Sequence, residues 1–156
     1  MYDCYRVPEE IAVRIDAEVM RAAVFGIFRH FGAPEQDARR CADSLIYADL
    51  RGIESHGVSN MMKWYVKGLT EGWLNPAPKC KIVREAPGSA TLDGDKGVGL
   101  AVGPQAMQLA IEKARECGIG AVSVTNSWHV GAVGYHASLA MQHDMIGIAT
   151  TAAGIY

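Results

Sequence analysis

The stretch that decides the fold joins two expected helices and reads Asp49-Leu50-Arg51-Gly52-Ile53-Glu54-Ser55-His56-Gly57. Apolar residues recur at helical spacing before it, over residues 38 to 50, and again after it, over residues 55 to 69. The Arg-Gly pair between the two runs is expected to turn the chain. The stretch therefore predicts two successive helices, and the second of them begins with Ser55 and His56.

A further helix is expected on the amino-terminal side, over residues 16 to 31, where Asp16 offers a side-chain oxygen to the free N–H groups of the first turn. Residues 13 to 15 before it form a short β-like run. Gly32 ends this helix, and Pro34 stands where the next helix can begin without losing a needed donor. We therefore expect an amino-terminal part made of three helices.

The pattern changes on the carboxyl-terminal side. Prolines within residues 73 to 79 favour an extended connection, and we place a boundary there, between a helical subdomain at residues 1–76 and an α/β part at residues 77–156. In the second part we expect a hairpin of strands at 82–84 and 90–92, a buried strand at 121–124, a strand at 145–149, and helices at 104–117 and 132–143. Helices followed by alternating strands and helices indicate an α/β (α+β) fold.

The charge balance narrows the classes of partner. The chain holds 15 Lys and Arg against 17 Asp and Glu, with a net charge of -2 and no clustered run of either sign. We therefore expect no nucleic acid and no membrane as a partner. No apolar stretch approaches the roughly 18 to 20 residues of a membrane span, and the first residues lack the pattern of a signal peptide. A cytoplasmic protein is expected.

Disulfides and metal sites are not expected either. The four cysteines, Cys4, Cys41, Cys80 and Cys117, are far apart and lack the CxxC spacing of zinc and redox sites, so we expect reduced thiols. No two histidines share the i, i+4 spacing with a carboxylate that zinc motifs use. The expected metal content is therefore none.

His56 is the first candidate for proton chemistry, because it stands where a loop enters a helix. An imidazole exchanges a proton near neutral pH, and a helix amino terminus lowers its pKa by disfavouring the cation. Ser55 is placed to cap the same helix. The alternative is that Ser55 is only a cap and His56 an ordinary residue of the first turn.

His129 is the second candidate. It follows Asn126-Ser127-Trp128 directly after an expected strand, and active groups in open α/β folds gather beyond the carboxyl ends of strands. The alternative is a loop histidine whose hydrogen bonds are made to the backbone. The other three histidines, His30, His136 and His143, are expected to be structural or exposed, at helix ends or inside a helix.

The segment from Asp93 to Gly99 is rich in glycine, but it lacks both the GxGxxG and the GK[ST] patterns, and its aspartates would repel a phosphate. We interpret it as a tight loop that brings a strand onto the following helix. No dinucleotide fingerprint occurs elsewhere in the chain. The cofactor-binding residues therefore stay unassigned at this point.

The stretch from Asp49 to Gly57 resembles the signature of the malate/L-lactate dehydrogenase family, which is distinct from the Rossmann-type lactate and malate dehydrogenases. The likeness continues, in the same order, through Gly72-Trp73-Leu74-Asn75-Pro76-Ala77-Pro78, Leu92-Asp93-Gly94-Asp95, Ala110-Ile111-Glu112-Lys113-Ala114 and Asn126-Ser127-Trp128-His129. Five segments in one order are far more specific than any one of them. The family includes malate, sulfolactate and ureidoglycolate dehydrogenases and reductases of cyclic imines.

The resemblance implies a helical domain beside part of a nicotinamide-binding domain with a non-Rossmann sheet. It implies hydride transfer between NAD or NADP and a 2-oxo or 2-hydroxy acid, with the protein supplying the proton. By resemblance, the proton-transfer role falls to His56 or to His129. We expect His129 to be the acid/base and His56 the other catalytic residue, and we expect Ser55, Arg51 and Asn126 to bind the substrate. A homodimer is expected, because relatives are commonly dimers.

The sequence departs from the family in one residue of the signature region. Many relatives have an arginine four residues after the histidine that matches His56, whereas this chain has Asn60. A bidentate clamp for a carboxylate is then missing.

The family also continues beyond the matching part, so we expect an oxidoreductase in an incomplete chain. The alternative is a catalytically inactive remnant that acts as a dimerising or binding module, and a hydrolase is disfavoured because no GxSxG elbow occurs.

Overall fold

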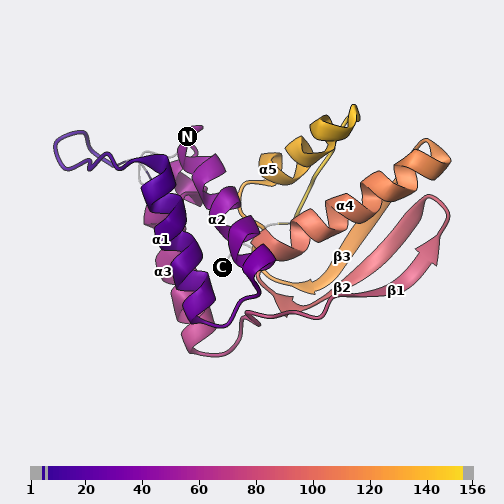
Figure 1. Cartoon of the computed structure of the whole chain (residues 1–156), viewed down its shortest axis with the longest axis horizontal. Coiled ribbons are helices and arrows are strands. Elements are labelled where there is room, and N and C mark those ends of the chain that lie inside the picture. The colour runs from indigo at the N-terminus through magenta and orange to yellow at the C-terminus, as the bar shows by residue number, and fades with distance from the viewer. Residues whose placement is uncertain (1–4, 6, 153–156) are drawn as a thin grey trace.

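The computed structural model describes residue 5 and residues 7 to 152, so Cys4 lies outside the described residues. The elements are α1 (Ala17–His30), α2 (Glu35–Asp49), η2 (Glu54–His56), α3 (Val58–Thr70), β1 (Lys81–Ala86), β2 (Ser89–Gly97), α4 (Gly99–Cys117), β3 (Ala121–Ser127), α5 (Val133–Ser138) and η3 (Leu139–His143). Figure 1 shows α1, α2 and α3 gathered into a bundle, with α4 lying across the sheet beside it. The expected order of helices, then strands and helices, is confirmed.

The helical bundle forms because each helix has an apolar side and a start signal. Asp16 caps α1 as predicted, since its Oδ1 accepts hydrogen bonds from the backbone N–H groups of Glu18 at 2.9 Å and Val19 at 3.1 Å. Phe28 of α1 and Tyr65 of α3 are buried and their ring centroids lie 6.1 Å apart. The strand expected at residues 13 to 15 is wrong, because these residues pair with no other strand and remain exposed.

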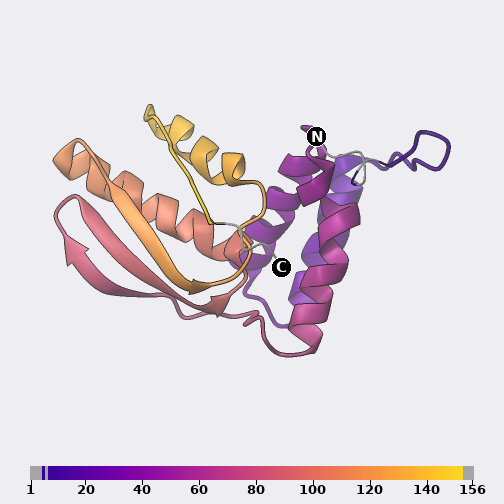
Figure 2. The ribbon, with the colours of Figure 1, turned by 180° about the vertical axis from the view of Figure 1, so that it is seen from behind.

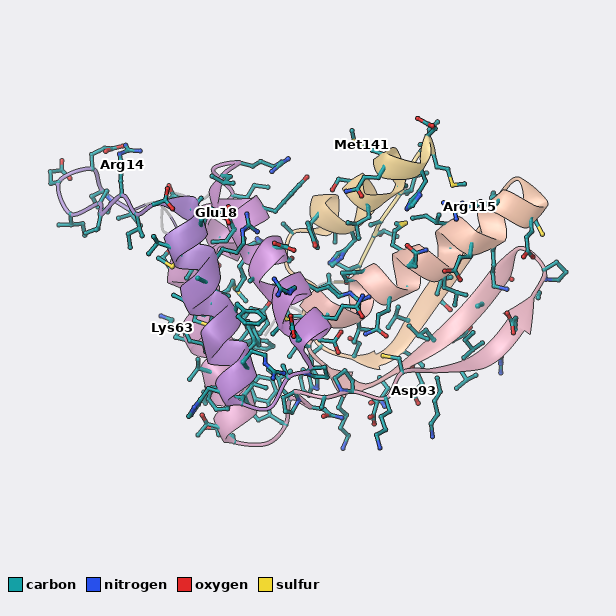
Figure 3. The ribbon with its side chains drawn as sticks, in the orientation of Figure 1. Arg14, Glu18, Lys63, Asp93, Arg115 and Met141 are labelled. Carbon is teal, nitrogen blue, oxygen red and sulfur yellow. The ribbon has the colours of Figure 1, made fainter. Side chains whose placement is uncertain are left out.

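The sheet has the order β1-β2-β3. β1 and β2 form the expected antiparallel hairpin, and β2 and β3 run parallel because α4 carries the chain from the end of one to the start of the other. Alternate residues of β2 point toward α4, where Leu92 packs against Val102 and Ala106. Asp93, one residue further, lies on the opposite face, as Figure 3 shows.

Four expectations about the second part are wrong. β2 continues to Gly97 and α4 begins at Gly99, where a loop was expected, because Leu100 and Val102 are fully buried and their packing extends the helix before Pro104. β3 is an edge strand with mostly exposed residues, not a buried one.

The other two differences concern the last described residues. Residues 145 to 149 form no strand, since no neighbouring strand pairs with them, and Ile146 is 94% exposed. The helix expected at residues 132 to 143 is split into α5 and the 3-10 helix η3. Within residues 7 to 152, no helix is both long and apolar enough to span a membrane.

Candidate functional site

The two candidate histidines lie against each other. His56 comes from η2, between α2 and α3, and His129 comes from the loop after β3. Their imidazole rings are stacked, with centroids 5.3 Å apart and planes inclined by 22°. Figure 2 shows that the carboxyl-terminal end of β3 and the loop after it lie beside the helical bundle, which brings these distant segments together. Both histidines are partly buried.

His129 is held by the helical bundle. The hydroxyl of Tyr65 lies 2.7 Å from Nδ1 of His129, and Tyr65 is fully buried. Burial raises the pKa of Tyr65 well above its ordinary value, so the phenol keeps its proton, and its oxygen can also accept a hydrogen bond. When the neutral His129 ring carries its hydrogen on Nδ1 and donates it to the Tyr65 oxygen, Nε2 has a free lone pair for proton transfer.

The backbone of His129 is held by α4. An added Cβ at Gly99 would lie 2.5 Å from the carbonyl oxygen of His129 and would also collide with the carbonyl oxygen of Trp128. The N–H of Trp128 donates to the carbonyl of Gly97 at 3.2 Å. A glycine at residue 99 is therefore what lets the loop approach the start of α4.

The neighbourhood of His56 corrects the predicted cap. Ser55 does not cap α3, because Gly57 is the N-cap residue and the N–H of Val58 donates to Oδ2 of Asp49 at 3.1 Å. The Ser55 hydroxyl instead lies 2.8 Å from Nδ1 of His56. Gly57 makes the Asp49 contact feasible, because a Cβ there would collide with the Asp49 carboxylate. Ser55 and His56 thus form a hydrogen-bonded pair.

Burial shifts both imidazoles toward the neutral form. Burial lowers the pKa of His56, so the expected direction is confirmed while its cause is burial and not the helix terminus. Burial, followed by the proximity of His56, lowers the pKa of His129 from 6.5 to about 4. A neutral His129 near pH 7 can accept a proton, which is what a general base must do.

Aromatic rings extend from the histidines to a hollow in the surface. Trp64 lies 5.8 Å from His129 and 4.8 Å from Trp73, and Trp73 lies 4.8 Å from Trp128, in each case between ring centroids. The hollow has a volume of ≈ 340 Å³ and is lined by Trp73, Lys96, Asn126, Ser127 and Trp128. Its size falls at the lower end of small-molecule pockets.

A larger groove, with a volume of ≈ 1480 Å³, runs along β3 and α4 and is lined by residues of both and by residues 144 to 152. Asn126, Ser127 and Trp128 line the hollow and this groove alike, so the two concavities meet at the end of β3. Neither His56 nor His129 is among the residues that line the hollow or the larger groove. The ring contacts of Trp64 with His129 and with Trp73 connect the histidines to the hollow.

Asn126 lies at the hollow, whereas Arg51 lies elsewhere. Asn126 has a φ of 50° and its Nδ2 donates to Oδ1 of Asp93 at 2.8 Å. The guanidinium of Arg51 lies 3.6 Å from the centre of the Tyr47 ring, at the exposed end of α2. Asn60, which replaces the arginine of many relatives, donates from Nδ2 to the carbonyl of Glu54 at 2.8 Å.

Sequence reasoning missed three residues of the site. Tyr65 was assigned to the apolar side of a helix, and helical spacing carries no signal for a hydroxyl that reaches a distant imidazole. Lys96 was placed in a loop interpreted only as a turn, although it is the one cationic side chain that lines the hollow. Asp49 stood inside the signature, yet its cap of α3 acts over nine residues of sequence, beyond the usual cap spacing.

The remaining predictions concern the other histidines, the cysteines and metals. His136 is buried and bonded to the backbone, which confirms a structural position. Cys41, Cys80 and Cys117 are free thiols. Within the part of the chain that the structure describes, no group of three or more His, Cys, Asp or Glu side chains is arranged to hold a metal ion.

Known proteins share this fold and sequence. A family model described as malate/L-lactate dehydrogenase matches residues 15–155. The malate dehydrogenase of Pyrococcus abyssi is 51% identical over 143 residues, which are 92% of this chain and 39% of that protein. The L-sulfolactate dehydrogenase of Methanocaldococcus jannaschii is 45% identical over 128 residues, which are 82% of this chain and 37% of that protein.

A solved structure gives the same result for the fold. The malate dehydrogenase of Pyrococcus horikoshii OT3 superposes with a TM-score of 0.83 at 42% sequence identity, covering 88% of this chain and 39% of that chain. The resemblance stated from the five sequence segments and the expected α/β (α+β) class are therefore both confirmed. The chain spans less than half of the length of the relatives that it matches.

Proposed function

Because the chain belongs to the malate/L-lactate dehydrogenase family, we propose that it carries the proton-transfer site of a nicotinamide-dependent oxidoreductase acting on 2-oxo and 2-hydroxy acids. The observation that carries this proposal is the stacked pair of His56 and His129, with the Tyr65 hydroxyl bonded to His129. The names of the relatives do not favour the alternative of an inactive dimerising module.

The proposed reaction oxidises the hydroxyl carbon of the acid to a carbonyl, and the reverse reaction reduces it. A bound nicotinamide supplies or accepts the hydride. The residues of this chain supply the proton: in the oxidative direction Nε2 of neutral His129 accepts the hydroxyl proton, and in the reductive direction the protonated ring returns it to the carbonyl oxygen. Partly buried imidazole and indole rings offer the flat, water-poor surroundings that a nicotinamide ring requires.

His56 and Ser55 have a different proposed part. The Ser55 hydroxyl bonds Nδ1 of His56 at 2.8 Å, so this pair is suited to hold and orient an oxygen of the substrate beside His129. The proximity of His56 also keeps His129 neutral. Asn126 retains a proposed substrate-binding role because it lines the hollow. Arg51 has no place in the proposed site, because its guanidinium lies over Tyr47.

Lys96 is the proposed partner of the substrate's negative charge. It lines the same hollow as Trp73 and Trp128, and this chain has Asn60 where many relatives carry an arginine. Malate and sulfolactate, which appear in the names of relatives, are 2-hydroxy acids with a second anionic group. We propose a substrate of this chemical class, and either NAD or NADP as the cofactor.

The proposed setting is a homodimer in the cytoplasm. Large apolar side chains near the end of the described chain are exposed, with Met141 at 71%, Ile146 at 94% and Ile148 at 83%, and such a surface favours association. Free thiols at Cys41, Cys80 and Cys117 agree with a reducing compartment. Light scattering on the purified chain measures the oligomeric state directly.

Titration of the chain with NADH and with NADPH, followed by nicotinamide fluorescence, tests the cofactor. A panel of 2-oxo acids, with and without a second anionic group, then tests turnover by the loss of nicotinamide absorbance. The proposal expects saturable binding of one nucleotide and turnover of at least one dianionic 2-oxo acid. Saturable binding without turnover of any 2-oxo acid would contradict the proposed reaction.

A further inference from the structure

The loop that carries His129 has no regular secondary structure from Trp128 to Ala132. A catalytic side chain on such a loop is placed accurately only if other contacts fix the backbone on both sides of it. On one side, the N–H of Trp128 donates to the carbonyl of Gly97, and Gly99 of α4 lies against the His129 carbonyl. On the other side the first residue is Val130.

His136 of α5 reaches back to that residue. Its Nε2 lies 2.7 Å from the carbonyl oxygen of Val130. A carbonyl oxygen only accepts hydrogen bonds, so Nε2 carries the hydrogen and donates it. The ring is buried, with an exposure of 5%, so water does not compete for this bond. The peptide that follows His129 is therefore tied to a buried side chain.

We propose that His136 is a positioning residue for His129: its hydrogen bond to the Val130 carbonyl holds the catalytic imidazole in place between Tyr65 and His56. This inference rests on the proposed function, because only an acid/base role of His129 makes its placement matter for turnover. The placement itself can be measured without any activity.

The other ring nitrogen of His136 argues against a role as mere core filling. Nδ1 is buried and has no hydrogen-bond partner among the residues that the structure describes. An apolar side chain of similar size would fill the same space without leaving a polar atom unpaired. Burial lowers the pKa of His136 and the bond to Val130 opposes this shift. A neutral ring with its hydrogen on Nε2 suits the Val130 bond.

The His136 ring packs against α4. An added Cβ at Gly103 would lie 2.6 Å from Cε1 and 2.7 Å from Nδ1 of His136, which is too close for any real contact. Gly99, four residues earlier on the same helix, gives the corresponding room to the His129 carbonyl. One face of α4 therefore receives both the catalytic peptide and the ring that holds it.

Two substitutions of nearly the same size distinguish a positioning role of His136 from a role as core filling. His136→Gln keeps an N–H donor near the place of Nε2, whereas His136→Met fills a similar volume without a donor. We expect the imidazole NMR signals of His129 in the isotope-labelled chain to keep their positions in the Gln variant. In the Met variant we expect them to shift and broaden, and we expect kcat to fall by about 10- to 100-fold with little change in KM.

A role as mere core filling predicts different results for the two variants. If His136 only fills space, the Met variant is at least as stable as the Gln variant and leaves the His129 signals and kcat unchanged, which would overturn the proposal. Should the Met variant fail to fold, Gly103→Ala is the second test, because it displaces the ring while improving helix propensity. Unshifted His129 signals in folded Gly103→Ala would overturn the proposal equally.

The proposed function fails in a distinguishable way. If the wild-type chain shows no turnover while the His129 signals respond to His136→Met and not to His136→Gln, the positioning stands and the assigned reaction is wrong. If the signals respond to neither substitution, the positioning is wrong whatever the activity.

Discussion

The hydroxyl of Tyr65, a fully buried residue of α3, lies 2.7 Å from Nδ1 of His129, which follows the sheet's edge strand. This contact ties the helical bundle to the loop that carries the proposed acid/base. It also fixes which nitrogen of His129 remains for proton transfer. The placement of the imidazole therefore depends on packing in the bundle as well as on the sheet.

Tyr65→Phe removes this contact and little else. We expect a loss of about 1 to 2 kcal/mol in the free energy of unfolding, because Nδ1 of His129 loses its partner, and a lower kcat. Urea denaturation and steady-state kinetics measure the two effects. Tyr135→Phe in α5 is the matched control and should leave kcat unchanged. Equal kcat values for both variants would contradict a role of the Tyr65 hydroxyl.

Stability should fall in mild acid because of His129. Its folded-state pKa is lowered from 6.5 to about 4, so between these pH values the unfolded chain binds a proton that the folded chain does not. The contribution is fully present above pH 6.5 and is lost as the pH falls toward 4, on the order of 1 to 3 kcal/mol. Burial lowers the pKa values of His56 and His136 too, and they add to the same loss.

Urea denaturation across this pH range measures the effect, with His129→Asn as the comparison. The variant should show a flatter decline in the free energy of unfolding between pH 6.5 and pH 4. An unchanged slope in folded His129→Asn would show that the imidazole is not buried as described.

Gly99→Ala tests the close approach of the His129 loop to α4. A Cβ there has no room against the carbonyl of His129, so we expect a loss of about 1 to 3 kcal/mol in stability and a reduced kcat. Gly26→Ala in α1 is the control, because no atom lies within 4 Å of the added Cβ, and it should be neutral or stabilising by up to about 1 kcal/mol. A thermal melt that ranks Gly99→Ala with Gly26→Ala would argue against the packing.

Lys96→Met tests the proposed contact with the substrate's charge. Removing the ammonium should raise KM for a dianionic 2-oxo acid by about 10-fold or more, with kcat changed much less. The matched control is Lys63→Met on the exposed side of α3, labelled in Figure 3, which should leave KM unchanged. A KM that rises equally in both variants would point to a general effect of net charge.

Local signals in the sequence were enough to predict much of the fold. The cap at Asp16 and the apolar spacing of the three helices act within a few residues, so they were found correctly. The hairpin of β1 and β2 was found for the same reason. Residues 145 to 149 have the composition of a strand, but strand formation depends on a pairing neighbour that composition cannot show.

The site was predicted only in part, for a similar reason. His56 and His129 were chosen from their residue type and their places at element ends. Their stacking, the Tyr65 bond and the role of Lys96 arise from contacts between segments far apart in the sequence. The subdomain boundary after residue 76 and the roles of the site residues remain predictions.

The most direct test of the proposed chemistry compares kcat of the wild-type chain with that of His129→Ala, using NADH or NADPH and the best dianionic 2-oxo acid. The proposal predicts that kcat falls by about 10²- to 10⁴-fold, the usual cost of removing a general acid/base, while circular dichroism shows the same fold. A wild-type kcat retained by His129→Ala would contradict the assignment of His129 as the acid/base.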